Sequence, residues 1–370
     1  MEKRNFGNTG LRTSILGFGG FHLLEIPLAE AKVLLNGYLD AGGNYIETAF
    51  GYGDGESERK IGRAVSHRRD EYVLVTKTGE RGRQGCLDSL NRSLANLKTD
   101  HVDVLLMHAV GTMEDLDAIL APDGAVSGAE QAVREGKVRF IGLSMHGQPD
   151  VLVEALRRYP FRAVMTTINY YDHFNYPEIE ETLLPLANAK NIAVILMKPV
   201  ADGLLYRTAE PAFRYAFSQP VSVVVGGINN RAMLEADLAY AESFIPMSDA
   251  EKEELYRDAP ELGTYVCRQC GKCLTCPEGI DMPAIFRLEG YYDRQMADGT
   301  VTDTADFALR QRLRFWFGNR GLAMEQYRDM PVKADRCTGC GICTPKCPYG
   351  IDIIRKLGIS DYKLADKDIY

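Results

Sequence analysis

Short apolar runs alternate with longer amphipathic stretches over about the first 245 residues of this 370-residue chain. Eight runs have the length and composition of buried strands: Ser14–Leu16, Tyr45–Thr48, Tyr72–Thr76, Val102–Met107, Val138–Leu143, Ala163–Ile168, Ala193–Met197 and Val221–Val225. Most of the intervening stretches have helical periodicity: Leu28–Ala41, Ser57–Val65, Leu87–Leu97, Gln148–Tyr159, Ile179–Asn188 and Arg231–Ala241. Because strands that alternate with helices form parallel sheets, eight such repeats predict an α/β fold, a (β/α)8 TIM barrel.

A doubly wound open sheet is the alternative fold for this alternation. That fold favours a Gly-x-Gly-x-x-Gly turn after its first strand, and the chain has Gly17-Phe18-Gly19-Gly20 there instead. The barrel is therefore the preferred prediction. Ahead of it, Asn5–Thr13 is expected to form a small hairpin.

The pattern changes from about Glu261, where two cysteine-rich runs flank a stretch of mainly helical character. Helices are expected over Met282–Met296 and Thr304–Asn319. Their apolar residues are expected to pack as a small core: Ile285, Phe286, Tyr291, Phe307, Leu313, Phe315 and Trp316. We therefore predict a barrel domain over residues 1–258 and a helical two-cluster ferredoxin-like domain over residues 259–370.

Eight of the nine cysteines lie in the two runs. The first run is Cys267-x2-Cys270-x2-Cys273-x2-Cys276-Pro277, and the second is Cys337-x2-Cys340-x2-Cys343-x3-Cys347-Pro348. The second has the spacing of bacterial ferredoxins, and the first departs from it by one residue. The runs therefore predict two [4Fe–4S] clusters.

In two-cluster ferredoxins the fourth cysteine of each run binds the other cluster. That rule assigns Cys267, Cys270, Cys273 and Cys347 to one cluster, and Cys337, Cys340, Cys343 and Cys276 to the other. Zinc sites and a disulfide framework are the alternatives, although zinc ribbons usually split their cysteines into two separated pairs. The remaining cysteine, Cys86, is expected to be a small buried apolar side chain.

Composition and charge narrow the class of protein. The chain is 45% hydrophobic with a formal net charge of −8, and no basic run suggests a nucleic-acid partner. No apolar stretch has the length of a membrane span, and the N-terminal residues lack an apolar signal stretch. Thiolates that must stay reduced to hold iron favour a cytoplasmic location.

Four ionisable residues lie at or just after the ends of three consecutive predicted strands: Glu47, Tyr52, Lys77 and His108. The active sites of such barrels lie at the C-terminal ends of the strands, so these side chains are expected to converge. The set suits carbonyl reduction, in which hydride addition leaves an alkoxide that needs a proton. An ammonium beside Tyr52 is expected to lower the tyrosine pKa, while Glu47 holds Lys77 and His108 orients the carbonyl oxygen.

With these residues the chain resembles the aldo/keto reductase superfamily, in the branch that carries a C-terminal iron–sulfur domain. The stretches that carry the resemblance are Gly7-Asn8-Thr9-Gly10-Leu11, Leu16-Gly17-Phe18-Gly19, Asn44–Ala49 with Tyr52-Gly53, Ser57-Glu58, Thr76-Lys77, Leu105–His108, Ile141–His146 and Cys276–Ile280. The resemblance implies that Tyr52 donates the proton, that Lys77 tunes its pKa and that His108 orients the substrate. The family has Asp where this chain has Glu47, and usually Asn where it has Met145.

The resemblance also implies a nicotinamide cofactor, NADP or NAD. The positions expected to bind it are Ser144, Asn169, Lys198, Gly203, Leu204, Gly227, Asn230 and Arg231. Lys198–Leu204 and Gly226–Asn230 are the loops expected to bind its phosphates, the second because it leads into a helix N-terminus. No basic residue clearly matches the family's anchor for the 2′-phosphate, so the choice between NADP and NAD stays open.

The sequence thus predicts an NAD(P)H-dependent oxidoreductase that reduces an aldehyde or ketone and carries two clusters. A small carbonyl compound is the expected substrate, and a ferredoxin-type protein is a candidate redox partner. The alternative is an electron-transfer or redox-sensing protein whose barrel has lost catalysis. Met145, Met165 and Ala236 favour that alternative, because they stand where the family contacts its cofactor.

Overall fold

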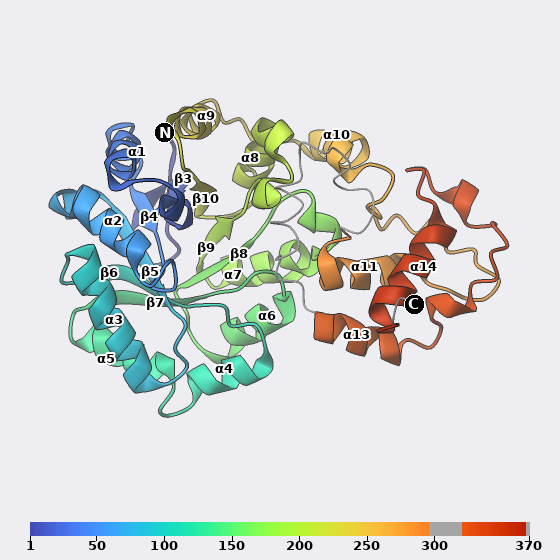
Figure 1. Cartoon of the computed structure of the whole chain (residues 1–370), viewed down its shortest axis with the longest axis horizontal. Helices are drawn as coiled ribbons and strands as arrows, with labels where there is room; N and C mark the ends of the chain where they lie inside the picture. Colours follow the sequence, from blue (N-terminus) through green and yellow to red (C-terminus); the bar gives the residue numbers. More distant parts are fainter. Residues whose placement is uncertain (296–319, 368–370) are drawn as a thin grey trace. The chain divides into compact units, whose positions relative to one another are not determined.

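The strands of the N-terminal region close into a parallel barrel, as the alternation predicts. A computed structural model describes residues 1–295 and 320–367. The strands follow one another around the closed barrel in the order β10-β3-β4-β5-β6-β7-β8-β9, and Figure 1 shows them with the helices around them. Their bounds are β3 Leu16–Gly19, β4 Tyr45–Glu47, β5 Val73–Thr78, β6 Val102–Met107, β7 Val138–Ser144, β8 Ala163–Thr167, β9 Ala193–Met197 and β10 Val223–Gly227.

The helices that connect these strands are α1 Leu28–Asp40, α2 Glu56–Val65, α3 Arg83–Leu97, α4 Met113–Leu120, α5 Ala125–Arg134, α6 Pro149–Arg158, α7 Leu184–Ala189 and α8 Ala209–Phe217, and α9 Arg231–Glu242 follows β10. The remaining described helices are α10 Asp249–Asp258, α11 Met282–Asp293, α13 Arg320–Asp329 and α14 Ile353–Leu364. None of the helices in residues 1–295 and 320–367 combines the length and apolarity that crossing a membrane requires.

The first barrel strand differs from its prediction. It was expected at Ser14–Leu16, but β3 spans Leu16–Gly19. The two glycines look like a turn in the sequence, yet the barrel interior requires them. A Cβ on Gly17 would lie 2.6 Å from the Tyr45 ring and 2.9 Å from Val223, so a side chain there would clash with the packed interior. The expected hairpin does form, from β1 (Lys3–Asn5) and β2 (Arg12–Ser14).

The barrel interior is a packed apolar core. It is built from residues two apart on successive strands, such as Val73 and Val75 on β5 and Val104 and Leu106 on β6. Phe6, from the hairpin, joins the same core, and its ring centroid lies 6.0 Å from that of Tyr45. The interior is therefore filled, and any reactive groups must lie at the ends of the strands.

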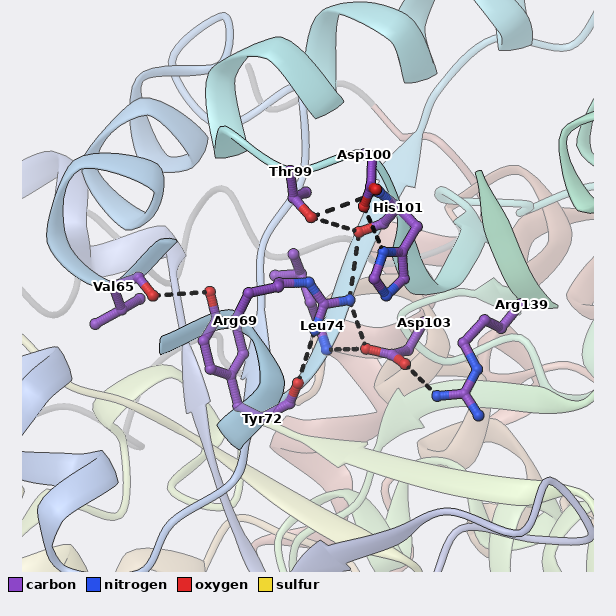
Figure 2. A network of polar contacts seen from close by, with 9 residues as sticks. All are labelled: Val65, Arg69, Tyr72, Leu74, Thr99, Asp100, His101, Asp103 and Arg139. Carbon is purple, nitrogen blue, oxygen red and sulfur yellow. Dashed lines mark hydrogen bonds and ion pairs between the residues drawn. The ribbon is translucent and has the colours of Figure 1, made fainter. Parts of the chain in front are cut away.

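A buried carboxylate ties three strands together near their N-terminal ends. Asp103 of β6 accepts hydrogen bonds from the backbone N–H of Leu74 on β5 at 2.9 Å and from Arg69 and Arg139, each at 2.8 Å. Figure 2 shows this arrangement, with Arg139 reaching Asp103 from β7. Because two guanidinium groups and an amide satisfy the charge of Asp103, we interpret this network as structural.

By its contacts the chain divides into two compact units. The barrel unit comprises residues 1–168, 180–199 and 210–246, and the C-terminal unit comprises 169–179, 200–209 and 247–370. The expected domain boundary between residues 258 and 259 stays a proposal, because the compact units interleave along the chain.

Within the C-terminal unit, helices α11, α13 and α14 contact one another. The predicted helix that begins at Met282 ends at Asp293, with Arg294 in a left-handed conformation as its cap. Ile285, Phe286 and Tyr291 are buried there, as expected. Met296, the predicted helix Thr304–Asn319 and its residues Phe307, Leu313, Phe315 and Trp316 lie outside the described residues.

The two cysteine runs are built as a repeat. Each ends in Cys-Pro-x-Gly-Ile-Asp followed by a helix. In both copies the glycine N–H donates to the carbonyl of the last cysteine, and the aspartate side chain caps the helix: Asp281 caps α11 and Asp352 caps α14. Gly271 and Gly341, each after the second cysteine of its run, both have positive φ. The runs therefore fold alike, although their last spacing differs by one residue.

Candidate functional site

The four ionisable residues lie at the C-terminal ends of adjacent strands. Glu47 is the last residue of β4, Lys77 is the second-last of β5, and His108 directly follows β6. Strand β5 pairs with β4 on one side and with β6 on the other. Tyr52 lies in the loop between β4 and α2.

Lys77 is at the centre of the group. Its buried ammonium forms an ion pair with Glu47 and donates hydrogen bonds to Tyr52 Oη at 3.0 Å and to the carbonyl oxygen of Thr48 at 3.0 Å. The Tyr52 ring meets His108 edge to face at a centroid distance of 5.9 Å. The structure thus brings the four predicted side chains together, and the longer Glu47 still reaches Lys77 where the family has Asp.

Burial dominates the electrostatics of Tyr52. Burial raises the tyrosine pKa, the Lys77 ammonium lowers it, and burial prevails, so the pKa of Tyr52 lies above its ordinary value. Lys77 lowers the tyrosine pKa, as predicted, but burial raises it by more. Burial lowers the pKa of Lys77, but Glu47 and Tyr52 raise it by more, so this pKa lies above its ordinary value. Lys77 therefore stays charged and Tyr52 stays protonated.

His108 is held neutral. Burial, followed by the positive charges of Lys77 and Arg81, lowers the pKa of His108 to about 3. Arg81 also fixes the loop that carries this histidine, because its guanidinium donates to the carbonyl oxygens of His108 at 2.9 Å and of Ala109 at 2.8 Å. Asp115 in turn holds Arg81 at 2.9 Å. This positioning pair joins residues far apart in the chain and was missed at the sequence level.

Of the residues expected to bind a nicotinamide cofactor, five lie in the barrel unit. Within residues 1–295 and 320–367, the hydroxyl of the buried Ser144 makes two long hydrogen bonds, accepting from the amide of Ala109 at 3.4 Å and donating to the carbonyl oxygen of Met107 at 3.5 Å. Asn230 caps α9 by accepting from the amide of Met233 at 2.9 Å. The other three are placed as follows: Lys198 directly follows β9, Gly227 ends β10 close to the His22 ring, and Arg231 begins α9 and is paired with Glu30.

The other three lie in the C-terminal unit. The Asn169 side chain bonds within its own turn, to the backbone amides of Tyr171 and Asp172 and to the Asp172 carboxylate. Gly203 has a φ of 93°, a conformation that favours glycine, and the neighbouring Leu204 is buried. The assignment of these eight residues to a cofactor stays a prediction.

Thr167 is a polar residue at the strand ends that the sequence did not single out. It is the last residue of β8 and lies two positions beyond Met165, whose side chain is part of the barrel core, so it points to the same interior face. Its hydroxyl is buried and has no hydrogen-bond partner within residues 1–295 and 320–367. An orphaned hydroxyl at this end of the barrel fits a site for a polar ligand group.

The C-terminal unit brings cysteines of both runs to one pocket. Its thiol lining is Cys267, Cys270, Cys273 and Cys347. Phe286, Ile351 and Ile353 are among its apolar walls, so the lining includes the four thiols predicted for one cluster.

Three thiols of the second predicted set lie within electrostatic reach of one another or of Cys343. Cys343 interacts electrostatically with Cys337 and Cys276, and Cys340 is exposed in the same run. In the part of the chain that the structure describes, no three His, Cys, Asp or Glu side chains converge as the ligands of a single metal ion would. Burial raises the pKa of the Cys267 thiol to about 12, so its ionisation requires positive charge close by.

Two known protein families match parts of this chain. The model of the aldo/keto reductase family matches residues 15–211. The chain belongs to the aldo/keto reductase family. The model of the 4Fe-4S dicluster domain matches residues 266–352, C-terminal to it. The family resemblance and the fold class predicted from the sequence are confirmed. The chain is an oxidoreductase of this family with an added dicluster domain.

Curated relatives match somewhat more than half of the chain. L-galactose dehydrogenase of Arabidopsis thaliana is 31% identical over 231 residues, which cover 58% of this chain and 70% of the relative. The uncharacterized oxidoreductase YqkF of Bacillus subtilis (strain 168) is 30% identical over 217 residues, which cover 55% and 67%. Among solved structures, the holo form of aldo-keto reductase AKR11C1 from Bacillus halodurans has a TM-score of 0.61 at 25% identity, covering 69% of this chain and 95% of that one.

Proposed function

We propose that this aldo/keto reductase family member reduces a small aldehyde or ketone with a nicotinamide cofactor, at the C-terminal ends of β4, β5 and β6. The observation that carries the proposal is the Lys77 ammonium, bonded at once to Glu47 and to Tyr52 Oη. A tyrosine that is protonated at neutral pH and bonded to a fixed ammonium is a proton donor for a newly formed alkoxide.

A reduced nicotinamide, when bound, supplies a hydride. Addition of that hydride to the carbonyl carbon would leave the nicotinamide oxidised and the electron pair of the opened C=O bond on the oxygen, which then needs a proton. Tyr52 Oη gives its proton to that oxygen, and the resulting phenolate is stabilised by Lys77, which Glu47 keeps charged. Since His108 is neutral, its N–H orients the carbonyl oxygen by a hydrogen bond without giving up a full proton.

The barrel unit supplies groups that fit the nicotinamide. Within the described residues the Ser144 hydroxyl makes two long hydrogen bonds and the Thr167 hydroxyl has none, so both can take up a carboxamide. The amides at the start of α9 and the Gly226–Asn230 loop are suited to phosphate. We assign two further cofactor contacts in the barrel unit to Lys198 and Arg231.

In the C-terminal unit we propose two [4Fe–4S] clusters. One is held by Cys267, Cys270, Cys273 and Cys347, and the other by Cys276, Cys337, Cys340 and Cys343. The pocket that gathers three thiols of the first run with Cys347 of the second supports this crossed arrangement. Such clusters pass single electrons, whereas hydride transfer moves two, so we assign the clusters to exchange with a separate one-electron partner of the ferredoxin type.

Replacement of Tyr52 by phenylalanine tests the assigned chemistry. The Tyr52→Phe variant keeps the ring contacts but loses the proton, so kcat for NADPH- or NADH-dependent reduction of an aldehyde probe such as para-nitrobenzaldehyde should fall about 10²- to 10⁴-fold. Cofactor affinity should change little.

Tyr256→Phe is the matched control, because it removes a phenolic hydroxyl from the C-terminal unit, and its kcat should stay at the wild-type value. An unchanged kcat in Tyr52→Phe would remove Tyr52 from the mechanism.

A further inference from the structure

Two buried cations border the pocket of Cys267, Cys270, Cys273 and Cys347. Lys356, on α14, is 1% exposed, and Arg268, next to Cys267, is 8% exposed. Buried lysine and arginine side chains are costly, so their presence here requires a reason. Among the described residues of the C-terminal unit the only other buried cation is Arg294, which is bonded to Asp172.

Lys356 is held in place behind the pocket wall. Its ammonium is 2.6 Å from the carboxylate of Glu289 on α11, 3.5 Å from the ring centroid of Tyr265 and 5.1 Å from that of Phe286. Phe286 itself lines the pocket. The ammonium lies near enough to favour the thiolate of Cys267. Its charge is thus fixed on one side of the pocket.

Arg268 brings a second fixed charge to the pocket, which it lines directly. Its guanidinium donates to the carbonyl oxygens of Leu262 at 3.1 Å and Val266 at 2.5 Å, and it lies 4.8 Å from the Tyr349 ring centroid. No carboxylate neutralises it among the hydrogen bonds and ion pairs found within residues 1–295 and 320–367. The thiolates of Cys267 and Cys347 interact favourably with its charge.

The second set of thiols has a different environment. The basic residues in and beside its run are Arg336 and Lys346, and both are exposed. Arg336 is also paired with Glu278 at 3.5 Å. Exposed charges are screened by water and salt and act weakly, whereas buried charges act at close to full strength.

We propose that Arg268 and Lys356 make the two clusters unequal, so that the cluster in the Cys267–Cys347 pocket has the higher reduction potential. The inference rests on the cluster assignment proposed above. Taking up one electron makes a [4Fe–4S] centre more negative, and a fixed positive charge beside it stabilises that reduced form. A single electron from an external low-potential donor then resides on this cluster, and the cluster of Cys276, Cys337, Cys340 and Cys343 is the more reducing of the two.

A redox titration of the whole protein tests the inference. The clusters are reduced stepwise with dithionite under anaerobic conditions, and electron paramagnetic resonance follows each reduced signal. In wild type two midpoint potentials are expected. In Lys356→Met the higher potential should fall while the lower one stays, because the methionine keeps the apolar stem and loses the charge.

Lys363→Met is the matched control. Lys363 lies on the same helix and bonds the same Glu289 at 2.9 Å, but its other partner is Asp293 at 2.6 Å. The Lys363→Met variant perturbs the same buried network without removing a charge that favours Cys267. Both midpoint potentials should therefore stay close to wild type. An equal shift in the two variants would overturn the proposal, as would a shift of the lower potential alone.

Arg268 provides a second, independent pair of variants should Lys356→Met fail to fold. Arg268→Gln should lower the higher potential, and Arg268→Lys, which retains the charge, should restore most of it. If both potentials are unmoved in Arg268→Gln, the inference is wrong while the cluster assignment stands. If wild-type protein contains fewer than two clusters by iron and sulfide analysis, the proposed function itself is wrong in that part.

Discussion

In the proposed mechanism, the contact between Lys77 and Tyr52 allows a buried, protonated tyrosine to lose its proton when an alkoxide forms. Burial disfavours the phenolate, so Tyr52 gives no proton to water at neutral pH. The ammonium 3.0 Å away offsets part of that cost once a strong base is present. Lys77 also forms a buried ion pair with Glu47. Removing one partner of a buried ion pair costs about 3–5 kcal/mol, so Glu47 supports the fold as well as the chemistry.

At the same scale, Thr167 offers a test of cofactor or substrate contact. Thr167→Val is nearly isosteric and removes only the hydroxyl, so KM for the nicotinamide or the aldehyde should rise roughly 5- to 10-fold, the value of about one hydrogen bond. Steady-state kinetics measures this.

Thr166→Val is the control for this prediction. Thr166 is the neighbouring residue on β8, is also buried, and also lacks a hydrogen-bond partner in the described residues, but it points to the opposite face of the strand. Equal effects of the two substitutions would contradict a ligand contact at Thr167.

His108 predicts a pH dependence of stability. Its pKa is about 3 in the folded chain and about 6.5 in an unfolded one, so unfolding takes up a proton between these values. The stability contributed by the neutral histidine is fully present above about pH 6.5 and is lost as the pH falls toward 3. In denaturant titrations followed by circular dichroism, His108→Gln should therefore lose less stability than wild type between pH 7 and pH 5.

His67→Gln, which replaces an exposed histidine, is the comparison variant. Parallel pH profiles for wild type and His108→Gln would show that the histidine is not held neutral.

At the scale of elements, the ends of the barrel strands determine where the candidate site lies. The alternation of apolar runs located seven barrel strands to within two residues, and with them Glu47, Lys77 and His108, because strand ends in such a barrel meet at one face. The first strand was misplaced because Gly17 and Gly19 have no side chains to show the alternation. Arg81, Thr167 and Lys356 could not be foreseen, because their roles depend on contacts between residues distant in the sequence.

Gly17 therefore carries a prediction about packing. Gly17→Ala would place a Cβ against Tyr45 and Val223 inside the barrel, and such overpacking should destabilise the barrel by about 1–3 kcal/mol. Gly79→Ala is the control, since a Cβ there meets nothing within 4 Å, and it should change stability by less than about 0.5 kcal/mol. Chemical denaturation of both variants measures the difference, and equal stabilities would contradict the account of β3.

At the scale of the whole molecule, an aldo/keto reductase family barrel and a 4Fe-4S dicluster domain belong to one chain. The cysteine spacing predicted the second unit, and the family comparison confirms a dicluster domain over residues 266–352. The spacing does not contain the proposed inequality of the two thiol environments, which rests on Arg268 beside Cys267 and on Lys356 of α14.

The central claim is that the barrel transfers hydride from a nicotinamide to a carbonyl carbon. Its most direct test is a single turnover of the anaerobically purified, cluster-loaded protein with para-nitrobenzaldehyde and NADPH, or NADH, deuterated at the transferred position. The account predicts that one of the two cofactors is consumed and that its deuterium appears on the carbinol carbon of the alcohol. If neither cofactor binds nor is consumed while the clusters remain intact, the claim is contradicted, and the barrel is the scaffold of an electron-transfer or redox-sensing protein.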